Sequence, residues 1–293
     1  MTSVRVDFVD FWPGFDRKNN VLLDVLRTRF AVEVVDDPDF LFFANFGRCH
    51  RRYRCIRIFY TGENVRPDFR RCDWALTFDH LPGEPRHLRW PLYNLYLDDP
   101  SFLLARRRDV DAVVAEKTRF CNIVCSNPRA KERLRFLEQL SRYKRVQSGG
   151  RVRNNVGGPV RDKLAFIRHH RFTIAFENAS YPGYTTEKIV EPMRVDSIPI
   201  YWGNPLVHLD FNTASFVSWH ACGSDEATIE RIIEIDRDEA LYRQMLLQPW
   251  LPGGRLTAYS DRDVLLDWLE RVFAARRASR PDGPCWSRLR RFW

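Results

Sequence analysis

Hydrophobic and polar positions alternate along the first third of the chain in a way that predicts strands and helices in turn. Apolar residues recur at every second position over residues 4–12 and at helical spacing over residues 19–30. Further short runs rich in β-branched and aromatic residues follow at 31–35, 39–45, 55–63 and 73–79. These runs are apolar on both faces, which is typical of parallel strands covered by helices on each side. The pattern therefore predicts an α/β layer architecture.

A second alternation of strands and helices follows a charged stretch between residues 98 and 118. We expect strands at 120–126, 172–178, 197–203 and 215–219. We expect helices from Asn127 (N-cap) and Pro128 (first turn) to about Tyr143, from about Thr186, around 226–247 and around 261–277. The glycine-rich stretch 148–160 between them is predicted to be a loop.

The two alternations predict two Rossmann-like α/β domains joined by a short linker. We place the first domain at residues 1–115, the second at 116–270 and a basic, amphipathic tail at 271–293. The 293 residues suit two domains, and no apolar run approaches the length of a membrane span. The first apolar stretch holds Arg5 and Asp7, which is not the pattern of a signal peptide, so we expect a cytoplasmic protein.

The net charge of +9 is concentrated near the end of the sequence. The last 23 residues hold seven Arg and one Asp, a net +6, so the other 270 residues carry only +3. This balance argues against a nucleic-acid partner for the body of the protein. In the tail, aromatic residues such as Trp286 and Phe292 lie among the arginines, a pattern that suits peripheral contact with an anionic membrane surface, although a basic end that only aids solubility is the plain alternative.

Three junctions between a predicted strand and the following loop or helix hold polar residues that can carry chemistry. Glu63 follows the apolar strand IRIF beside Gly62 and can act as a general base. Arg133 follows the 120–126 strand and can present a bidentate fork to a phosphate. Glu187 and Lys188 fall in the first turn of the helix that begins near Thr186. A lysine there is unfavourable beside the positive end of the helix dipole unless an anion offsets it.

Each of these residues also has a plain structural interpretation. Glu63 can be a solvated turn carboxylate, Arg133 can be one surface arginine among 41, and Glu187 with Lys188 can be a solvated ion pair. The seven cysteines form no CxxC pair, which favours ordinary thiols over a metal site or disulfides. The sequence also lacks a P-loop, HExxH, GxSxG and an evident DxD pair. A bound diphosphate would therefore have to be neutralised by protein cations and helix N-termini, with no metal cofactor.

At these junctions the sequence resembles the α-1,3/4-fucosyltransferases, in particular their bacterial branch. The resemblance rests on FTIAFENASYPGYTTEKIVEPMRVDSIPIYWGNPLV (172–207), RIFYTGEN (57–64) and CSNPRAKERLRF (125–136) with YKRVQSGGRVRNNVGGPV (143–160). These motifs lie in the family's order over residues 57 to about 219. The sequence departs from the family at Gln147, where an Asp is often found, and at Pro192, where a helix former is usual.

The resemblance implies a GT-B glycosyltransferase in which two Rossmann-like domains face a cleft. It implies an inverting enzyme that moves L-fucose from GDP-fucose to O3 of an N-acetylglucosamine or N-acetyllactosamine glycan acceptor, without an essential metal. By this resemblance, Glu63 matches the general base, and Arg133 and Lys188 match the cations that bind the diphosphate. Glu187 matches a carboxylate that contacts the ribose and fucose, and Asn178 and Tyr184 match other donor-pocket positions.

Two other hypotheses remain open from the sequence. One is a GT-B transferase that uses another nucleotide sugar, such as GDP-mannose. The other is a non-catalytic protein of the same fold that binds glycans or polyanions. The first 50 residues carry no motif that matches the family closely, so the acceptor is the part of the hypothesis with the least sequence support.

Overall fold

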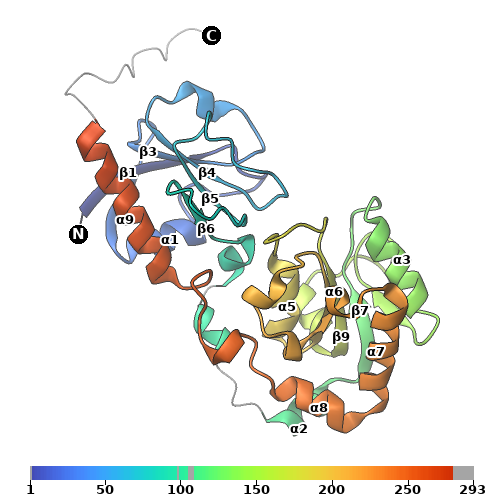
Figure 1. The fold of residues 1–293 in the computed structure, drawn as a ribbon. Coiled ribbons are helices and arrows are strands. Elements are labelled where there is room, and N and C mark those ends of the chain that lie inside the picture. The colour runs from blue at the N-terminus through green and yellow to red at the C-terminus, as the bar shows by residue number, and fades with distance from the viewer. Residues whose placement is uncertain (1, 98, 105–108, 280–293) are drawn as a thin grey trace. The chain divides into compact units, whose positions relative to one another are not determined.

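The computed structural model describes residues 2–97, 99–104 and 109–279 of the chain (Figure 1). The chain forms two compact units: unit 1 is Met1–Trp90 with Asp261–Trp293, and unit 2 is Pro91–Ser260. Each unit is an α/β unit built on a parallel sheet, as the hydrophobic pattern predicts. The division differs from the expected boundaries at 115 and 270, because the chain enters unit 2 at Pro91 and returns to unit 1 at Asp261.

Unit 1 contains, among its described residues, a six-stranded parallel sheet in the order β2-β1-β3-β4-β5-β6. Its strands are β1 (Thr2–Val9), β2 (Phe30–Val34), β3 (Phe40–Phe43), β4 (Ile56–Tyr60), β5 (Trp74–Thr77) and β6 (His87–Arg89). Helix α1 (Val21–Arg27) joins β1 to β2, and the 3-10 helix η1 (Cys49–Arg52) precedes β4. All four residues of β3 are buried, as expected for a central strand covered on both faces.

Helix α9 (Arg262–Ser279) belongs to unit 1 because its apolar stripe packs there. The ring of Phe273 lies 5.1 Å from that of Phe30 and 4.5 Å from that of Phe40. Trp268 packs edge-on against Trp74, with ring centroids 5.8 Å apart. The start of the predicted tail, residues 271–279, is thus part of this helix, and residues 280–293 lie outside the described residues.

Unit 2 contains, within its described part, a five-stranded parallel sheet in the order β11-β10-β9-β7-β8. Its strands are β7 (Arg119–Ile123), β8 (Val146–Ser148), β9 (His170–Phe176), β10 (Ile198–Trp202) and β11 (Val217–Ser218). Its helices are α2 (Val110–Glu116), α3 (Lys131–Leu140), α4 (Lys163–Arg168), α5 (Glu187–Arg194), α6 (Trp219–Cys222), α7 (Asp225–Arg237) and α8 (Glu239–Leu247). Short 3-10 helices complete it: η2 (Leu92–Tyr96), η3 (Pro100–Leu103), η4 (Val207–Leu209), η5 (Thr213–Ser215) and η6 (Pro252–Gly254).

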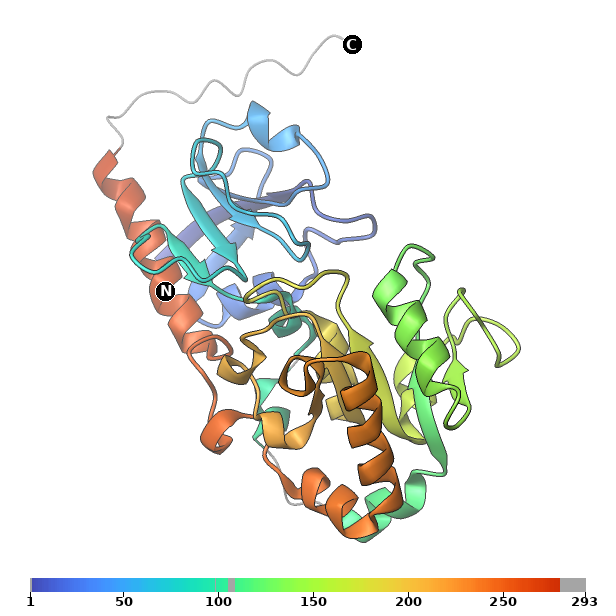
Figure 2. The same ribbon diagram turned by 45° about the vertical axis from the view of Figure 1, so that its right-hand side comes forward.

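Helices cover both faces of the unit 2 sheet, which gives it two hydrophobic cores (Figures 1 and 2). Phe172, Ile174 and Phe176 of β9 pack with α3, α7 and α8. Ala175, which points to the other face of the same strand, packs with α5. The two cores hold β9 rigidly between them, so the residues that follow β9 start from a fixed position.

Two helix predictions are corrected by local capping. The single helix expected around 226–247 is two helices, because Asp238 adopts an extended backbone and its carboxylate accepts from the N–H groups of Ala240 and Leu241 at the start of α8. Helix α3 begins at Lys131 and not at Pro128, because the Asn127 side chain accepts from the Arg129 N–H and closes a turn before the helix.

The described cysteines are all free thiols, and Cys285 lies outside the described residues. Within the part of the chain that the structure describes, no helix combines the length and the apolar character needed to cross a membrane.

Candidate functional site

The strand order of unit 2 defines where a ligand is expected to bind. Strand β7 lies between β8 and β9, so the connections that leave β7 and β9 at their carboxyl ends turn to opposite sides of the sheet. Ligands of open α/β sheets bind at such a switch point. Helix α3 follows β7 and the loop before α5 follows β9, so the predicted residues Arg133 and Asn178 come from the two connections that diverge there.

Arg133 lies in the first turn of α3 and is only 8% exposed. Its Nε donates to the Phe176 carbonyl (2.8 Å) and its Nη2 donates to Asn178 Oδ1 (2.7 Å). These two bonds to the end of β9 fix the guanidinium plane. Both acceptors are neutral, and Arg133 makes no ion pair within the described residues. A buried cation without a carboxylate partner is costly unless a ligand supplies the negative charge.

Lys188 is the second cation of the site, and two carboxylates hold it. Its Nζ lies 2.8 Å from Thr186 Oγ1, 3.0 Å from Glu187 Oε1 and 3.3 Å from Glu177 Oε2. Burial by itself lowers the pKa of Lys188, but Glu177 and Glu187 outweigh burial and raise the pKa above its usual value. Lys188 is therefore a charged side chain at neutral pH.

Glu177 is a site residue that the sequence analysis did not select. It is 1% exposed, and it accepts from both the N–H and the hydroxyl of Thr186, each at 2.7 Å. Thr186 is the N-cap residue of α5, but its side chain makes no capping bond, and the Glu177 carboxylate lies at the helix N-terminus instead. Burial raises the pKa of Glu177, with Lys188 opposing. The sequence signal that could have identified Glu177 is the Glu-Asn pair directly after strand β9.

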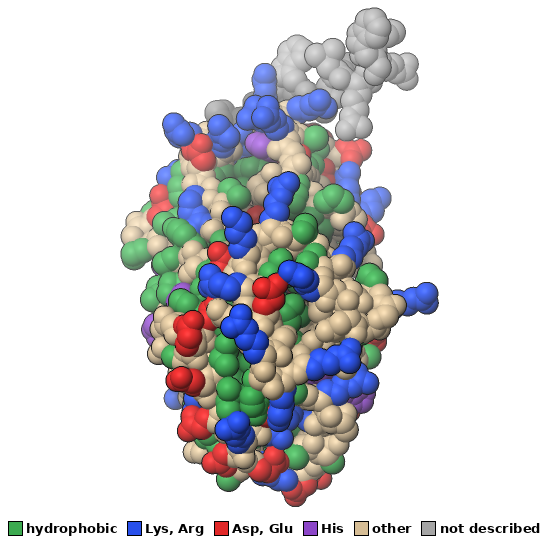
Figure 3. Space-filling model, turned by 90° about the vertical axis from the view of Figure 1, so that its right-hand side faces the viewer, with side chains coloured by type: hydrophobic (Ala, Val, Ile, Leu, Met, Phe, Trp, Pro, Cys, Tyr) green, Lys and Arg blue, Asp and Glu red, His purple; other side chains and the backbone are tan. Residues whose placement is uncertain are grey.

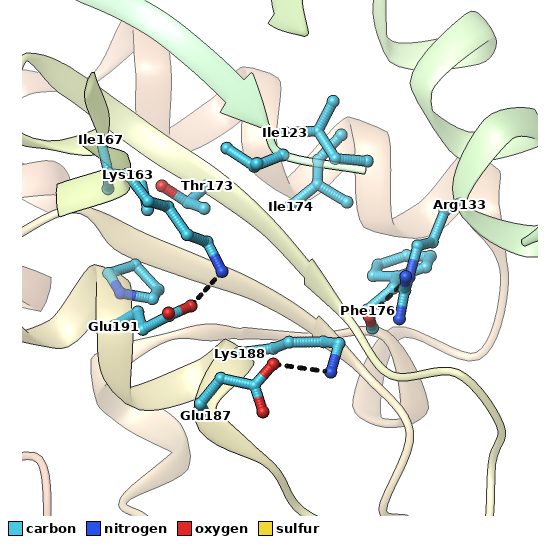
Figure 4. A pocket seen from close by; sticks show the side chains of 12 residues that line it. Ile123, Arg133, Lys163, Ile167, Thr173, Ile174, Phe176, Glu187, Lys188 and Glu191 are labelled. Atoms are coloured by element: carbon cyan, nitrogen blue, oxygen red, sulfur yellow. Dashed lines mark hydrogen bonds and ion pairs between the residues drawn. The ribbon is translucent and has the colours of Figure 1, made fainter. Parts of the chain in front are cut away.

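Glu187 opens α5 and lies beside Lys188 (Figure 4). Burial raises its pKa, but the nearby Lys188 and Lys163 outweigh burial, and the pKa of Glu187 is lowered. Glu187 is therefore an ionised carboxylate at neutral pH, with oxygens that can accept hydrogen bonds from hydroxyl groups.

Gly203 makes the position of Glu177 possible. A Cβ on Gly203 would lie 2.3 Å from Glu177 Cγ and 2.6 Å from its Cβ, and the φ of +154° disfavours other residues. The next residue, Asn204, is fully buried and ties the loop before α5 to the end of β10: its Oδ1 accepts from the Gly183 N–H (2.7 Å), and its Nδ2 donates to Thr185 (3.0 Å). The spacing of hydrophobic residues in the sequence cannot show that the Gly203 backbone lies this close to the Glu177 side chain.

A cavity of about 100 Å³ opens at this place, and Arg133, Glu187 and Lys188 line it together (Figure 4). Lys163 of α4 and Glu191 of α5 also line it and pair with each other, and neither was predicted from the sequence. The cavity has room for a compact group larger than a single water molecule, but not for a whole nucleotide. The lining holds three lysine and arginine side chains and two carboxylates, so the charges that line the cavity sum to a net positive charge.

The other predicted site residues lie outside this lining. Asn178 is exposed and acts on the cavity through its bond to Arg133. Tyr184 is 1% exposed, and its carbonyl accepts from the Tyr201 hydroxyl (3.3 Å), so its ring is part of the buried loop. Glu63 belongs to unit 1.

Glu63 follows β4 in a turn held by its own backbone. Its N–H donates to Thr61 Oγ1 (3.0 Å), and its carbonyl accepts from the Val65 N–H. The side chain is half-buried, and its carboxylate has no hydrogen-bond or ion-pair partner among the described residues. The turn therefore fixes the Glu63 backbone and leaves its carboxylate without a bond to the described residues.

The two departures from the family pattern have different surroundings. Gln147 lies in β8, and its amide oxygen contacts His170 Nε2 at 2.8 Å, away from the cavity. Burial lowers the pKa of His170 to about 4, so this ring is neutral near pH 7. Pro192 is inside α5 and lines the cavity, where its missing N–H removes one helix hydrogen bond.

No group of three or more His, Cys, Asp or Glu residues arranged to hold a metal ion is found within residues 2–97, 99–104 and 109–279.

Family models place this fold and site among the glycosyltransferases. Residues 6–96 match the Alpha-(1,3)-fucosyltransferase FucT N-terminal domain, and residues 114–250 match Glycosyltransferase family 10 (fucosyltransferase) C-term. The chain therefore belongs to the fucosyltransferase family, glycosyltransferase family 10, and its two parallel-sheet α/β units are those of the GT-B fold.

Individual relatives agree with this assignment. The Helicobacter pylori alpha-(1,3)-fucosyltransferase FucT is 33% identical over 268 residues, which are 79% of this chain and 56% of that protein. The mouse GDP-fucose protein O-fucosyltransferase 3 is 27% identical over 64% of this chain and 43% of its own length. The chain thus spans about half the length of these curated relatives. A crystal structure of an alpha1,3-fucosyltransferase matches with a TM-score of 0.83 at 28% identity, over 93% of this chain and 90% of that one. A crystal structure with GDP-fucose matches with a TM-score of 0.79 at the same identity, over 93% and 91%.

Proposed function

We propose that this protein transfers L-fucose from GDP-fucose to O3 of an N-acetylglucosamine- or N-acetyllactosamine-type glycan, with inversion at fucose C1. The observation that carries the proposal is Arg133, a buried cation without a carboxylate partner in the described residues, in the same cavity as Lys188. The similar solved structure bound to GDP-fucose supports the choice of donor.

The diphosphate is the group that the unit 2 cavity suits. As the bond between fucose C1 and the phosphate oxygen breaks, negative charge builds on the departing GDP. Arg133 and Lys188 stabilise that charge, and they need no reorganisation because Phe176, Asn178, Glu177 and Glu187 already hold them. The ionised Glu187 accepts hydrogen bonds from hydroxyls of the donor, and Asn178 and Tyr184 shape the donor pocket.

Glu63 takes the proton in this proposal. Direct inversion requires the acceptor hydroxyl to attack C1 from the face opposite the leaving diphosphate. The acceptor oxygen forms the new bond to C1, GDP leaves with the electron pair of the old bond, and the hydroxyl proton moves to the Glu63 carboxylate. Its fixed backbone, and a carboxylate that bonds to none of the described residues, support this role. In this proposal Arg133 and Lys188 stabilise the diphosphate without a metal ion.

The test measures GDP release from GDP-fucose in the presence and absence of N-acetyllactosamine. We expect release that requires the acceptor and that falls by at least about 10² in Glu63→Gln, the lower end of what general-base catalysis contributes. The matched control is Glu33→Gln, which removes an exposed carboxylate from the edge strand β2 of the same unit. Full turnover in Glu63→Gln would reject this residue as the base. Turnover with GDP-mannose but not with GDP-fucose would reject the proposed donor.

A further inference from the structure

A second cavity, of about 360 Å³, lies entirely within unit 1. Its lining comes from Phe43–Arg51, which ends β3 and includes η1, and from Phe59–Cys72, which ends β4. It therefore opens at the carboxyl ends of adjacent parallel strands, where open α/β sheets bind ligands. This is the larger of the two described cavities, and the donor chemistry does not use it.

The lining of this cavity is strongly cationic. Its charged side chains are four arginines (48, 51, 66 and 71) and a single carboxylate, Asp68. Arg66 pairs with Asp79 (2.9 Å) and Arg71 with Asp68 (3.2 Å). Arg48 and Arg51 are exposed and make no ion pair within the described residues. Figure 3 shows Lys and Arg side chains gathered at the upper end of the view, on unit 1.

The other part of the lining is apolar and rigid. Phe43 and Phe59 pack together at 5.4 Å, and the ring of His50 stacks on Phe43 at 4.2 Å. Asp10 fixes η1 beside these rings. Its carboxylate accepts from the N–H groups of Cys49 and His50 (both 2.9 Å) and lies 2.7 Å from His50 Nδ1. Arg51 of η1 and Arg48, which directly precedes η1, therefore belong to a fixed segment of a lining that also holds aromatic rings, a combination suited to a sugar that carries a negative charge.

The cavity is joined directly to the loop of the proposed base. The Thr61 hydroxyl donates to Asn45 Oδ1 (2.9 Å) and also accepts from the Glu63 N–H (3.0 Å). The Val65 N–H donates to the Glu63 carbonyl. Asn45 and Val65 both line the cavity, so a ligand bound there lies beside the Glu63 loop within the same unit.

We propose that this cavity binds the acceptor glycan through an anionic group, a carboxylate or a sulfate, that Arg48 and Arg51 recognise. The inference rests on the proposed function, which it deepens by giving the acceptor a chemical class. The two arginines make charge-assisted hydrogen bonds to the anion, and the apolar side chains of the lining contact the sugar.

The test measures binding of methyl β-glucuronide and methyl β-glucoside to the full chain by NMR at low ionic strength. The two sugars differ only at C6, where the glucuronide has a carboxylate and the glucoside has a hydroxymethyl group. We expect the glucuronide to bind at least about tenfold more tightly, and Arg48→Ala and Arg51→Ala each to weaken it by a similar factor. Arg52→Ala is the matched control, because Arg52 is an exposed arginine of the same 3-10 helix that does not line the cavity. Glucose 6-sulfate and inorganic sulfate complete the series and separate a sulfated sugar from a free anion.

Equal affinity for the two methyl glycosides, or no binding of either, would overturn the inference. An equal loss in Arg52→Ala, or inorganic sulfate that binds as tightly as glucose 6-sulfate, would also overturn it, since both would indicate a general basic surface. Binding requires no fucose transfer, so these outcomes are independent of the GDP-release assay. If the glucuronide binds as expected but no acceptor elicits GDP release, the proposed function fails and the anion-binding cavity stands.

Discussion

Replacing Lys188 with Met should lower the free energy of unfolding, because the buried Glu177 carboxylate then has no cation opposite it among the described residues. Lys188 is the cation that faces this 1% exposed carboxylate, with Nζ 3.3 Å from Oε2, and the Thr186 N–H and hydroxyl remain as its donors. Breaking a buried ion pair by removing one partner costs about 3–5 kcal/mol of unfolding free energy. We expect Lys188→Met to lose stability of that order at neutral pH.

The pH dependence of this loss follows from the direction of the Glu177 shift. Burial already raises the pKa of Glu177 in the folded protein, and removing Lys188 raises it further. The folded state then binds a proton that the unfolded state has released, so stability is retained below the unfolded-state pKa and falls as the pH rises toward the folded-state pKa. The loss in Lys188→Met should be small near about pH 4 and approach its full size near about pH 8.

Urea unfolding of four proteins at several pH values measures this effect. The set is the wild type, Lys188→Met, Glu177→Gln and the double variant, which together form a double-mutant cycle. Glu177→Gln removes the charge and keeps the side-chain size, so the double variant should regain the part of the lost stability that Glu177 causes and lose the pH dependence that comes with it. The loss from the broken Lys188–Glu187 pair should remain in both variants that lack Lys188. Lys131→Met is the control, an exposed lysine at the start of α3 that should change stability by less than about 0.5 kcal/mol.

Two results would contradict this expectation: a double variant that is as unstable at about pH 8 as Lys188→Met, or an equal destabilisation of Lys188→Met at all pH values. Either result would mean that Lys188 contributes through packing and not through the charge of Glu177.

Four further predictions concern the site and its surroundings. Arg133→Ala should lower the rate of fucose transfer by about 10²–10³, while Arg142→Ala, an exposed arginine just after α3, should leave it unchanged; similar rates for the two variants would remove Arg133 from the charge-stabilising role. Gly203→Ala should displace Glu177 and cost about 1–3 kcal/mol in urea unfolding, and wild-type stability would contradict the close approach. A chelator such as EDTA should leave GDP release intact, and complete loss that added metal restores would contradict diphosphate binding by protein cations alone. The full chain should cosediment with anionic vesicles more than with neutral ones and lose this preference when residues 280–293 are removed, whereas equal binding to both vesicles would contradict contact through the basic tail.

Much of the fold could be predicted because the strands of parallel sheets are hydrophobic on both faces. The expected strands at 31–35, 39–45 and 197–203 correspond to β2, β3 and β10, with ends that differ by one or two residues. Helix boundaries were less predictable, since capping depends on which side chain reaches the free N–H groups. Asn127 closes a turn before α3, and Asp238 divides one expected helix into two.

The site was predictable in part for a similar reason. Arg133, Glu187 and Lys188 stand next to strand ends and helix starts, which are visible in the hydrophobic pattern, and the fold brings them to one cavity. Lys163 and Glu191 were not predicted, because no helix was expected to begin at Lys163 and because Glu191 lies inside α5, away from its start. The net charge of only +3 over the first 270 residues also gave no sign of the arginines near η1, which the fold brings to one cavity.

The sequence alone determined the layer architecture, the family and the cations near the carboxyl ends of the strands, because local periodicity and short motifs encode these features. Tertiary structure decided which residues neutralise one another and which remain unpaired. Glu177 became the buried partner of Lys188, α9 returned to unit 1, and Arg133 was left facing the cavity without a carboxylate among the described residues. These outcomes depend on distances between segments far apart in the chain, and such distances follow from the packing of the two cores around β9 rather than from any local pattern.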